Sequence, residues 1–537
     1  CLAQNNWNLV WSLHEKPFLA PQALSEMAIV KAGFDTDEDG WGEFLCAWTD
    51  HTPDNYILMY EATGDDTYEL VWYWNYPISA NSFAGIAVGD IDNNGTVEII
   101  TTMPSVANAE TPNPPRLWVF EWNGVQGENK YGTYATSDPS PTNEWKFNLP
   151  DLTDFRPYSL VIEDIDQDGK NELIVGVRQG DRGREVLVAS VEGQLSGFGQ
   201  WIIEYNFQQD FGGSLYSVTT GDLDKDGNRE IYALIWDMFT MRIFECMGDG
   251  QYEIVTEFDE LYADEAIDYG ALDGVRIADV NNDGVNELYI AGTQPQNTLF
   301  IINNISDVSQ IKEDDIVEFY HIPQKADAGL RAMHIADPDK DGNLSLMIAG
   351  ERNGQIFDLE YNGEGDPADS SSWSLDVIFD IFELSDTAAS SLTPRLFYGH
   401  PAEDMDNDGK DEYVFVNYSS DFNVWEGDGY VWMVEIDPST SVENSANLLP
   451  KKIELKQNYP NPFNPGTKIN FNLDRGEHVK LVVTDILGRE IETIVDNFLS
   501  RGTHSYYFNA KPYTSGVYYY TLYAGDFVQT RKMLFTK

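Results

Sequence analysis

Short apolar runs of five or six residues recur along most of the chain, and each follows an acidic, glycine-containing turn. Three of them are Glu172–Val177, Glu230–Ile235 and Glu287–Gly292, which are almost continuously apolar after the first residue. Runs of this kind are typical of β-strands that are buried on both faces. A β-like run also precedes each turn, as in Tyr158–Asp164, so the pattern predicts strand pairs joined by the turn.

Each repeat also contains two later β-like runs. In the first repeat these are Tyr56–Tyr60 and Tyr68–Trp74, and in the fourth they are Met241–Glu245 and Tyr252–Phe258. Repeats of this length indicate one supersecondary unit that is copied and stacked. Four strands per unit, with no convincing helical pattern, predict an all-β fold in which residues 1–445 form a seven-bladed β-propeller.

The two ends of this array predict how the ring closes. The seventh repeat has strand-like runs at 395–399, 412–417 and 430–436, but it lacks a fourth. The N-terminal segment Trp7–Leu13 is a surplus strand that resembles the outer strand of the first repeat. We therefore expect the N-terminal strand to complete the last blade, because an open array would leave sheet edges exposed. Polar segments at 103–115 and 125–143 of the second repeat predict projecting loops.

The turn itself is a nine-residue phrase with acids or amides at positions 1, 3 and 5, glycine at position 6 and usually an acid at position 9. Oxygen-rich turns of this kind supply the ligands that calcium prefers. Without a cation, carboxylates about 4 Å apart repel each other by roughly 4 kcal/mol at an effective dielectric constant near 20. The predicted metal ligands are Asp35, Asp37, Asp39, Glu43, Asp90, Asp92, Asn94, Glu98, Asp164, Asp166, Asp168, Glu172, Asp222, Asp224, Asp226, Glu230, Asp279, Asn281, Asp283, Glu287, Asp337, Asp339, Asp341, Asp404, Asp406, Asp408 and Glu412.

Two other interpretations of the phrase are weaker. An EF-hand needs Glu at position 12, where this chain has Cys46, Thr101, Val175, Ala233, Ile290, Ile348 and Phe415. A simple hairpin turn explains the glycine but not the recurring acids. We predict up to seven structural calcium ions. Asn94 and Asn281 lower the charge of their loops, and Ser345 at position 9 predicts that the sixth site is the weakest.

These seven phrases resemble those of the FG-GAP/VCBS repeat family of integrin-alpha-like propellers, over roughly residues 1–445. The resemblance implies a calcium-binding blade but no particular ligand. The family includes adhesion modules, lectin-like proteins and a minority of polysaccharide lyases.

The C-terminal residues form a second predicted module, after a linker at 446–457. Residues 458–537 begin with a proline-rich phrase, Asn458–Pro465, followed by short strand-like runs that predict a small antiparallel β-sandwich. The module resembles the type A C-terminal sorting domain of the type IX secretion system, found in Bacteroidota and relatives. The resemblance implies the type IX secretion machinery as a partner and export to the outer cell surface or the medium.

Charge separates the same two modules. Residues 451–537 hold 12 basic and 8 acidic residues, a net charge of +4, whereas the rest holds 21 and 82, a net charge of −61 out of the chain's −57. The strongly acidic surface expected for the first module would repel nucleic acid. No apolar run is long enough to span a bilayer. Cys46 and Cys246 fall in predicted strands and are expected in the core, whereas Cys1 is either a signal-peptide remnant or a lipoprotein N-terminus.

No catalytic motif emerges from the sequence, so we lean towards a non-enzymatic role. Four arginines, Arg156, Arg276, Arg331 and Arg395, lie in or before the predicted innermost strands and could hold an anionic ligand in the central channel or neutralise nearby acids. We expect a calcium-stabilised binding or adhesion module for a glycan or a protein. The alternatives are an extracellular polysaccharide lyase or hydrolase and a subunit that assembles with itself into a fibre or sheath.

Overall fold

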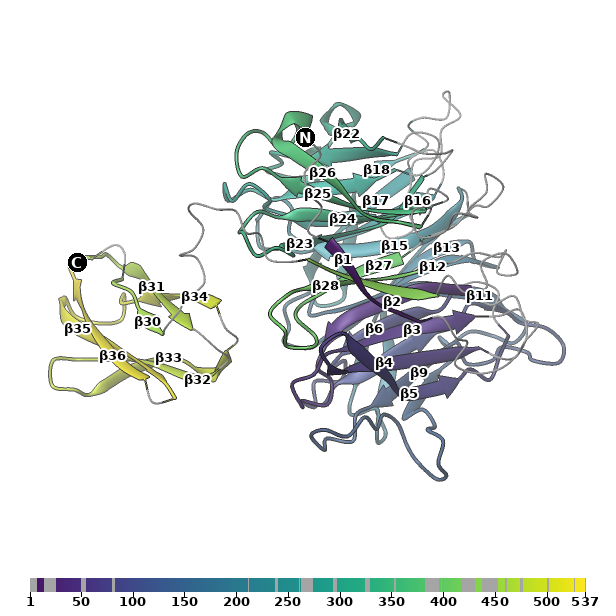
Figure 1. The fold of residues 1–537 in the computed structure, drawn as a ribbon, viewed down its shortest axis with the longest axis horizontal. Helices are drawn as coiled ribbons and strands as arrows, with labels where there is room; N and C mark the ends of the chain where they lie inside the picture. Colours follow the sequence, from purple (N-terminus) through teal and green to yellow (C-terminus); the bar gives the residue numbers. More distant parts are fainter. Residues whose placement is uncertain are drawn as a thin grey trace. The chain divides into compact units, whose positions relative to one another are not determined.

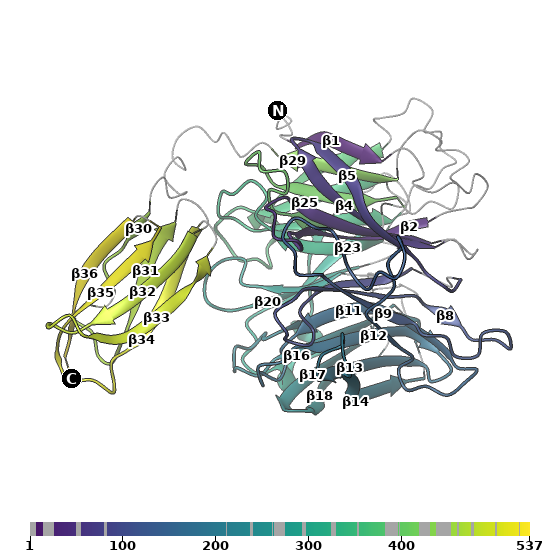
Figure 2. The same ribbon diagram turned by 90° about the horizontal axis from the view of Figure 1, so that it is seen from below.

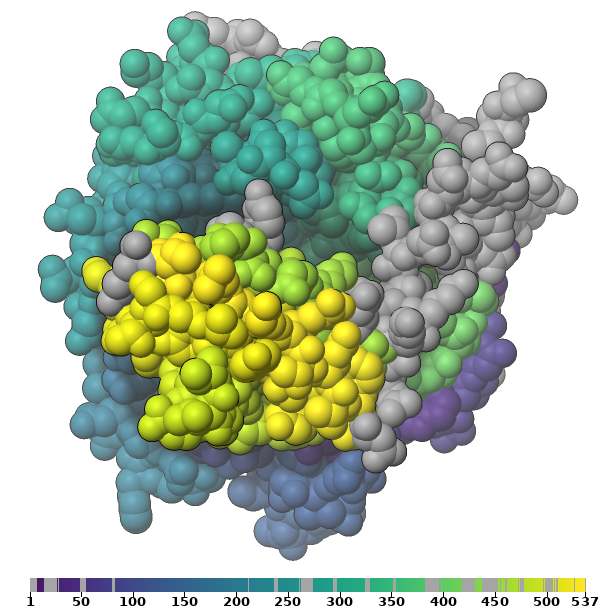
Figure 3. Space-filling view, turned by 90° about the vertical axis from the view of Figure 1, so that its left-hand side faces the viewer, coloured from purple at the N-terminus to yellow at the C-terminus, as the bar shows by residue number. Residues whose placement is uncertain are grey.

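The chain forms two compact units, Cys1–Ser439 and Thr440–Lys537 (Figure 1). In the space-filling view of Figure 3 the second unit is coloured yellow-green to yellow. The computed structural model describes residues 7–13, 26–49, 55–79, 83–210, 212–236, 240–259, 261, 274–292, 297–323, 329–351, 354–381, 396, 398–417, 430–436, 453–458, 461–473, 477–499, 502–525 and 527–536. Cys1, Arg395 and most of the expected linker lie outside these residues.

Seven antiparallel sheets, called blades one to seven, make up the first unit, and within each blade the strands run in order from the inner to the outer edge. Blades one and two are β2 (Glu26–Phe34), β3 (Glu43–Thr49), β4 (Tyr56–Gly64), β5 (Thr67–Asn75) and β6 (Gly85–Gly89), β7 (Glu98–Thr102), β9 (Leu117–Glu121), β10 (Asn143–Trp145). Blades three and four are β11 (Asp154–Glu163), β12 (Glu172–Gly180), β13 (Arg184–Glu192), β14 (Gln200–Gln209) and β15 (Ser214–Gly221), β16 (Glu230–Trp236), β17 (Thr240–Gly248), β18 (Gln251–Phe258). Blades five, six and seven are β19 (Val275–Ala278), β20 (Glu287–Ala291), β21 (Thr298–Ile302), β22 (Val317–His321); β23 (Gly329–Ala336), β24 (Ser345–Glu351), β25 (Gln355–Tyr361), β26 (Trp373–Asp380); and β27 (Tyr398–Ala402), β28 (Glu412–Val416), β29 (Val431–Ile436), β1 (Trp7–Leu13).

The inner strands contact one another in a closed cycle, in the order β2, β6, β11, β15, β19, β23, β27 and back to β2. The seventh blade is completed by the N-terminal strand, because β1 pairs antiparallel with β29, with Trp7 opposite Ile436 and Leu13 opposite Val431. Both predictions, the propeller fold and its closure by the N-terminal strand, are confirmed. Figure 2 shows the blades from below, with β1 beside β29.

The second strand of each blade is buried on both faces because it lies between neighbouring blades. Every residue of β7, β20 and β28 is buried. Large aromatic rings fill the space between outer strands, as where Trp145 of blade two stacks on Trp201 of blade three, with ring centroids 4.9 Å apart. Cys46 and Cys246 are buried free thiols, as predicted.

Two details differ from the expected four-stranded, loop-decorated unit. The first polar segment of blade two contains β8 (Ser105–Val106), which pairs with β11 and gives blade three a fifth strand. The second polar segment does not simply project. Tyr131 within it is fully buried, and its hydroxyl contacts Thr36 Oγ1 at 2.6 Å in the turn of blade one. Among the described residues, short 3-10 helices lie in other loops, at η2 (Val308–Gln310), η3 (Glu313–Asp315) and η4 (Ser370–Ser372).

The second unit consists of two antiparallel sheets that share one hydrophobic core, as predicted for a sandwich. Phe463 packs against Phe508 and Phe535 within this core. The prolines at 462 and 465 follow cis peptide bonds. The sheets are β30 (Glu454–Leu455), β31 (Gly466–Leu473), β34 (Gly502–Asn509) and β33 (Glu490–Leu499), β32 (Glu477–Thr484), β35 (Gly516–Ala524), β36 (Phe527–Phe535). Among the described residues no helix has the length and apolar character to cross a membrane.

Candidate metal centres

All seven acidic turns adopt the same backbone conformation between the first and second strands of their blades. The residue at position 4 has a left-handed φ of 53° to 64° in every copy, and the glycine at position 6 has a φ of 87° to 99°. A glycine is needed at position 6 because an L side chain is strained at such angles. These two left-handed residues turn the chain tightly enough to bring positions 1, 3 and 5 together.

Backbone N–H groups orient the side chains at positions 1 and 5 in each turn. The N–H of the position-6 glycine donates to the position-1 aspartate at 2.7 to 3.2 Å in all seven copies. The N–H of position 7 donates to the side-chain oxygen of position 5 at 2.7 to 2.9 Å, again in all seven. Because each bond engages one oxygen, the arrangement fixes the side chains without using all of their acceptors.

The position-9 glutamate closes six of the turns. Its Oε2 accepts the backbone N–H of position 2 at 2.7 to 3.1 Å. The second oxygen, Oε1, is buried without a hydrogen-bond partner in Glu43, Glu98, Glu230 and Glu412. Both carboxylate oxygens of Asp37, which is fully buried, are in the same condition. A buried acceptor without a partner is costly, so these oxygens are suited to a ligand inside the turn.

Burial also raises the pKa of the position-9 glutamates. It is the main reason that the pKa rises to about 9 in Glu43, Glu98 and Glu412, with a further contribution from the aspartates of the same turn. For Glu172 and Glu230 the pKa is raised to about 8, and for Glu287 to about 7. Each carboxylate therefore needs either a proton or a cation to stay buried at neutral pH.

The predicted ligands converge in the turns of blades one, four and seven. Ligand atoms lie within 4.8 Å of one another in three groups, which are Asp222, Asp224, Asp226 and Glu230; Asp404, Asp406, Asp408 and Glu412; and Asp35, Asp37 and Asp39. The donors in these turns are carboxylate and amide oxygens, without cysteine or histidine. Such hard oxygen donors fit calcium better than zinc or copper.

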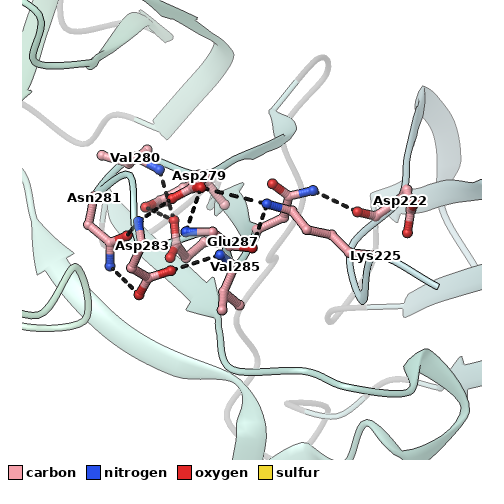
Figure 4. A network of polar contacts seen from close by, with 11 residues as sticks. Asp222, Lys225, Asp279, Val280, Asn281, Asp283, Val285 and Glu287 are labelled. Carbon is pink, nitrogen blue, oxygen red and sulfur yellow. Dashed lines mark hydrogen bonds and ion pairs between the residues drawn. The ribbon is translucent and has the colours of Figure 1, made fainter. Parts of the chain in front are cut away.

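A side chain at position 4 links each of several turns to the next one around the ring. Lys225 Nζ donates to the carbonyl oxygen of Gly284 at 2.7 Å and lies 3.6 Å from Asp279 Oδ2 in the following turn, as Figure 4 shows. The same link joins Gln167 to Gly227, Lys340 to Gly409 and, across the closure of the ring, Asn407 to Gly40. Sequence analysis missed these links, although the varied polar residues at position 4 were a signal.

Position 3 makes a second connection between neighbouring blades. Asp92 Oδ2 accepts the N–H of Leu195 at 2.7 Å, and Asp224 Oδ2 accepts that of Val308 at 2.8 Å. Asp406 Oδ2 accepts the N–H of Asp66 at 2.7 Å across the closure between blades seven and one. The turns therefore lie at the junctions between blades.

A second set of acids on the third strands was also missed. Glu61, Glu121, Glu245 and Glu435 pair in register with the position-9 glutamates Glu43, Glu98, Glu230 and Glu412. Oxygens of Asp37, Glu43 and Glu61 lie within 4.8 Å of one another. Lys410 contacts Glu435 and adds positive charge beside the seventh site. Hairpin register would have revealed this second acidic position.

The four predicted channel arginines have different surroundings. Arg156 forms a two-pronged ion pair with Asp154, at 2.8 and 2.9 Å. Arg276 lies 3.1 Å from the ring of His334, which in turn lies 4.5 Å from the ring of His400. Arg331 is buried, and Arg395 falls outside the described residues.

Arg276 also lines a cavity of about 100 Å³ beside the inner strands of several blades. Lys31 brings a second cation to its wall, and Ser159 and Thr219 bring hydroxyl groups. Three tyrosines, Tyr158, Tyr216 and Tyr398, contribute aromatic surface. No acidic residue is among the described residues that line this cavity, which contrasts with the strongly acidic chain.

Comparison with known proteins finds a family match within each unit. Residues 35–101 match the family model of the FG-GAP-like repeat, and residues 457–536 match that of the secretion system C-terminal sorting domain. No curated protein sequence matches the chain. Solved structures with some likeness include PorZ, a surface component of the type IX secretion system of Porphyromonas gingivalis (11% identity, TM-score 0.38, 94% of this chain and 59% of that one). Another is a fungal alcohol oxidase of the AA5 family in complex with copper (11% identity, TM-score 0.43, 96% and 100%). The chain thus spans 59% of the length of PorZ.

The closed cycle of blades defines a β-propeller, and residues 35–101 of it match the FG-GAP-like repeat. The match of residues 457–536 to a secretion system C-terminal sorting domain indicates export through the type IX secretion system, to the cell surface or the extracellular space.

Proposed function

We propose that this protein is a calcium-stabilised propeller that acts outside the cell as a binding module, with calcium in a structural role. The observation that carries the calcium proposal is the recurrence of buried, unpartnered Oε1 atoms at position 9 in blades one, two, four and seven. One such atom could be an accident of packing, but four at equivalent positions point to a common ligand. Seven turns would then hold the predicted ions.

The ligand-binding part of the proposal rests on the cavity beside the inner strands. Lys31 and Arg276 supply positive charge, the serine and threonine hydroxyls supply hydrogen bonds, and the tyrosine rings supply flat apolar surface. Acidic sugars present a carboxylate, hydroxyl groups and an apolar face, and this combination matches the wall of the cavity. We therefore favour an acidic glycan over a protein ligand. Since the cavity is small, it would take one terminal sugar residue rather than an internal stretch of chain.

The test is a glycan array probed with the full chain in calcium, followed by calorimetry with the best glycan. Arg276→Met should weaken binding at least about tenfold, the loss expected for a charge-assisted contact. Arg182→Met, a half-exposed arginine of blade three, is the matched control and should bind normally. Binding that is restricted to neutral glycans, or equal binding by both variants, would contradict the proposed ligand class. Release of unsaturated or newly reducing sugars during the assay would indicate an enzyme instead.

A further inference from the structure

The sixth turn differs from the other six at positions 2 and 9, which are joined by a hydrogen bond in the other copies. Position 2 is Pro338 and position 9 is Ser345. In the other copies the N–H of position 2 donates to the position-9 glutamate, for example from Met405 to Glu412 at 2.9 Å. Proline has no N–H to donate. The sixth turn has therefore lost both the donor and the acceptor of the same hydrogen bond.

A buried carboxylate returns on the neighbouring strand. Asp358 of β25 lies opposite Met347, two residues beyond the pair formed by Ser345 and Glu360. Residues two apart on a strand point to the same face, so Asp358 and Glu360 share a side of the blade. In the other six blades the residue equivalent to Asp358 is a buried hydrophobic side chain, namely Met59, Val119, Val188, Ile243, Ile301 and Met433.

Asp358 lies at the base of the sixth turn. It is 5% exposed, and its side chain hydrogen-bonds with those of Ser345 and Trp7. The negative charge of Asp358 contributes to raising the pKa of Asp339, the position-3 aspartate of the turn. Its Oδ1 is buried with no hydrogen-bond partner, which is the condition of Glu43 Oε1 and its equivalents. Six related blades show that an apolar residue fits at this position, so the unpartnered Oδ1 of a buried acid there calls for a further ligand.

We propose that the sixth turn binds a divalent cation through Asp337, Asp339, Asp341 and Asp358, with Asp358 supplying from the third strand the carboxylate that position 9 lacks. This inference rests on the proposed role of calcium in the other turns. It replaces the expectation of a weakest sixth site, which counted only the residues within the turn. Glu360 stands beside the site as Glu61 stands beside that of blade one, where the acid of the third strand approaches the ligands directly.

Crystals of the full chain grown in calcium and soaked with terbium test this directly, because anomalous scattering locates each ion. We expect an ion peak at the sixth turn in the wild type. Asp358→Asn keeps the shape of the side chain and should abolish that peak, and elemental analysis of the desalted protein should find one ion fewer per chain. Adding Ser345→Glu to Asp358→Asn should restore the ion. Asp380→Asn, which changes another buried aspartate of blade six, should leave it in place.

The outcomes separate the two proposals. If the wild type holds no ion at any turn, the proposed calcium role is wrong. If ions occupy other turns while the sixth turn is empty, or if Asp358→Asn retains the ion there, the role of calcium stands and the assignment of Asp358 is wrong. The wild-type crystal alone shows whether the sixth turn holds an ion, even if the Asp358→Asn variant fails to fold.

Discussion

Trp11 packs edge-on against Tyr68, with ring centroids 5.6 Å apart, although the two residues belong to different blades. Trp11 lies on β1, the outer strand of blade seven, and Tyr68 lies on β5, the outer strand of blade one. The same tryptophan also contacts Phe44 and Tyr60, both at 5.7 Å. One side chain from the N-terminal strand therefore fastens the last blade to the first.

Trp11→Ala should loosen this junction. We expect a loss of about 2–4 kcal/mol in the free energy of unfolding, near the lower part of the range for large aromatic residues because Trp11 is only partly buried. Leu9→Ala on the same strand is the control, since Leu9 is 43% exposed and should cost less than about 0.5 kcal/mol. Denaturant titrations followed by tryptophan fluorescence and by circular dichroism would measure both. Equal stabilities would show that the junction does not depend on this contact.

Removal of divalent cations should destabilise the propeller strongly. A ligand present at a hundred times its Kd stabilises the native state by about 2.7 kcal/mol per site. With several sites occupied, chelation should lower Tm by at least about 10 °C. Scanning calorimetry of the protein in excess chelator, and again after calcium is restored, would measure the change. Restoration by magnesium alone would point away from calcium, and an unchanged Tm would contradict the proposal of structural ions.

The stability of the cation-free protein should decrease as the pH rises. The position-9 glutamates have folded-state pKa values of about 7 to 9, raised by burial from 4.5. Folding therefore favours their protonated form, and this contribution is complete below about pH 4.5 and is lost as the pH rises through 7 to 9. In chelator, Tm should fall between pH 5 and pH 9. In calcium the fall should be much smaller, because the cation takes the place of the proton. Parallel pH profiles in the two buffers would contradict this explanation.

Glu98→Gln tests a single turn. The amide oxygen can still accept the N–H of Ile91, which now lies 2.8 Å from Glu98 Oε2, but the negative charge is gone. We expect unchanged or higher stability in chelator, and a smaller gain on calcium addition, by about 2–3 kcal/mol if the site is lost. Glu144→Gln, on the exposed outer strand of the same blade, should respond to calcium like the wild type. Thermal shifts at several calcium concentrations would distinguish the two.

Much of the fold could be predicted because its signals are local. The position-6 glycine and the acids around it mark each turn, and the apolar run from Glu230 to Ile235 marks the strand that follows. The missing fourth strand of blade seven and the surplus segment Trp7–Leu13 predicted the closure. All of these features are visible without knowing which blades are neighbours.

What could not be predicted depends on contacts between strands and blades. The role we propose for Asp358 requires the hairpin register that sets it beside Ser345, and an isolated aspartate in an apolar run gives no such information. The link from Lys225 to Gly284 joins turns that are far apart in sequence. The buried position of Tyr131 depends on the turn of blade one, so a polar segment that looks like a tolerated insertion is in fact a packed one.

The pairing of β1 with β29 also sets the order in which the molecule can be made. A ribosome releases Trp7–Leu13 long before its partner strand, which ends at Ile436, so this segment must wait for hundreds of residues before it can pair. Until then blade seven lacks its outer strand. The ring should therefore become resistant to proteases in a single late step, rather than blade by blade during synthesis.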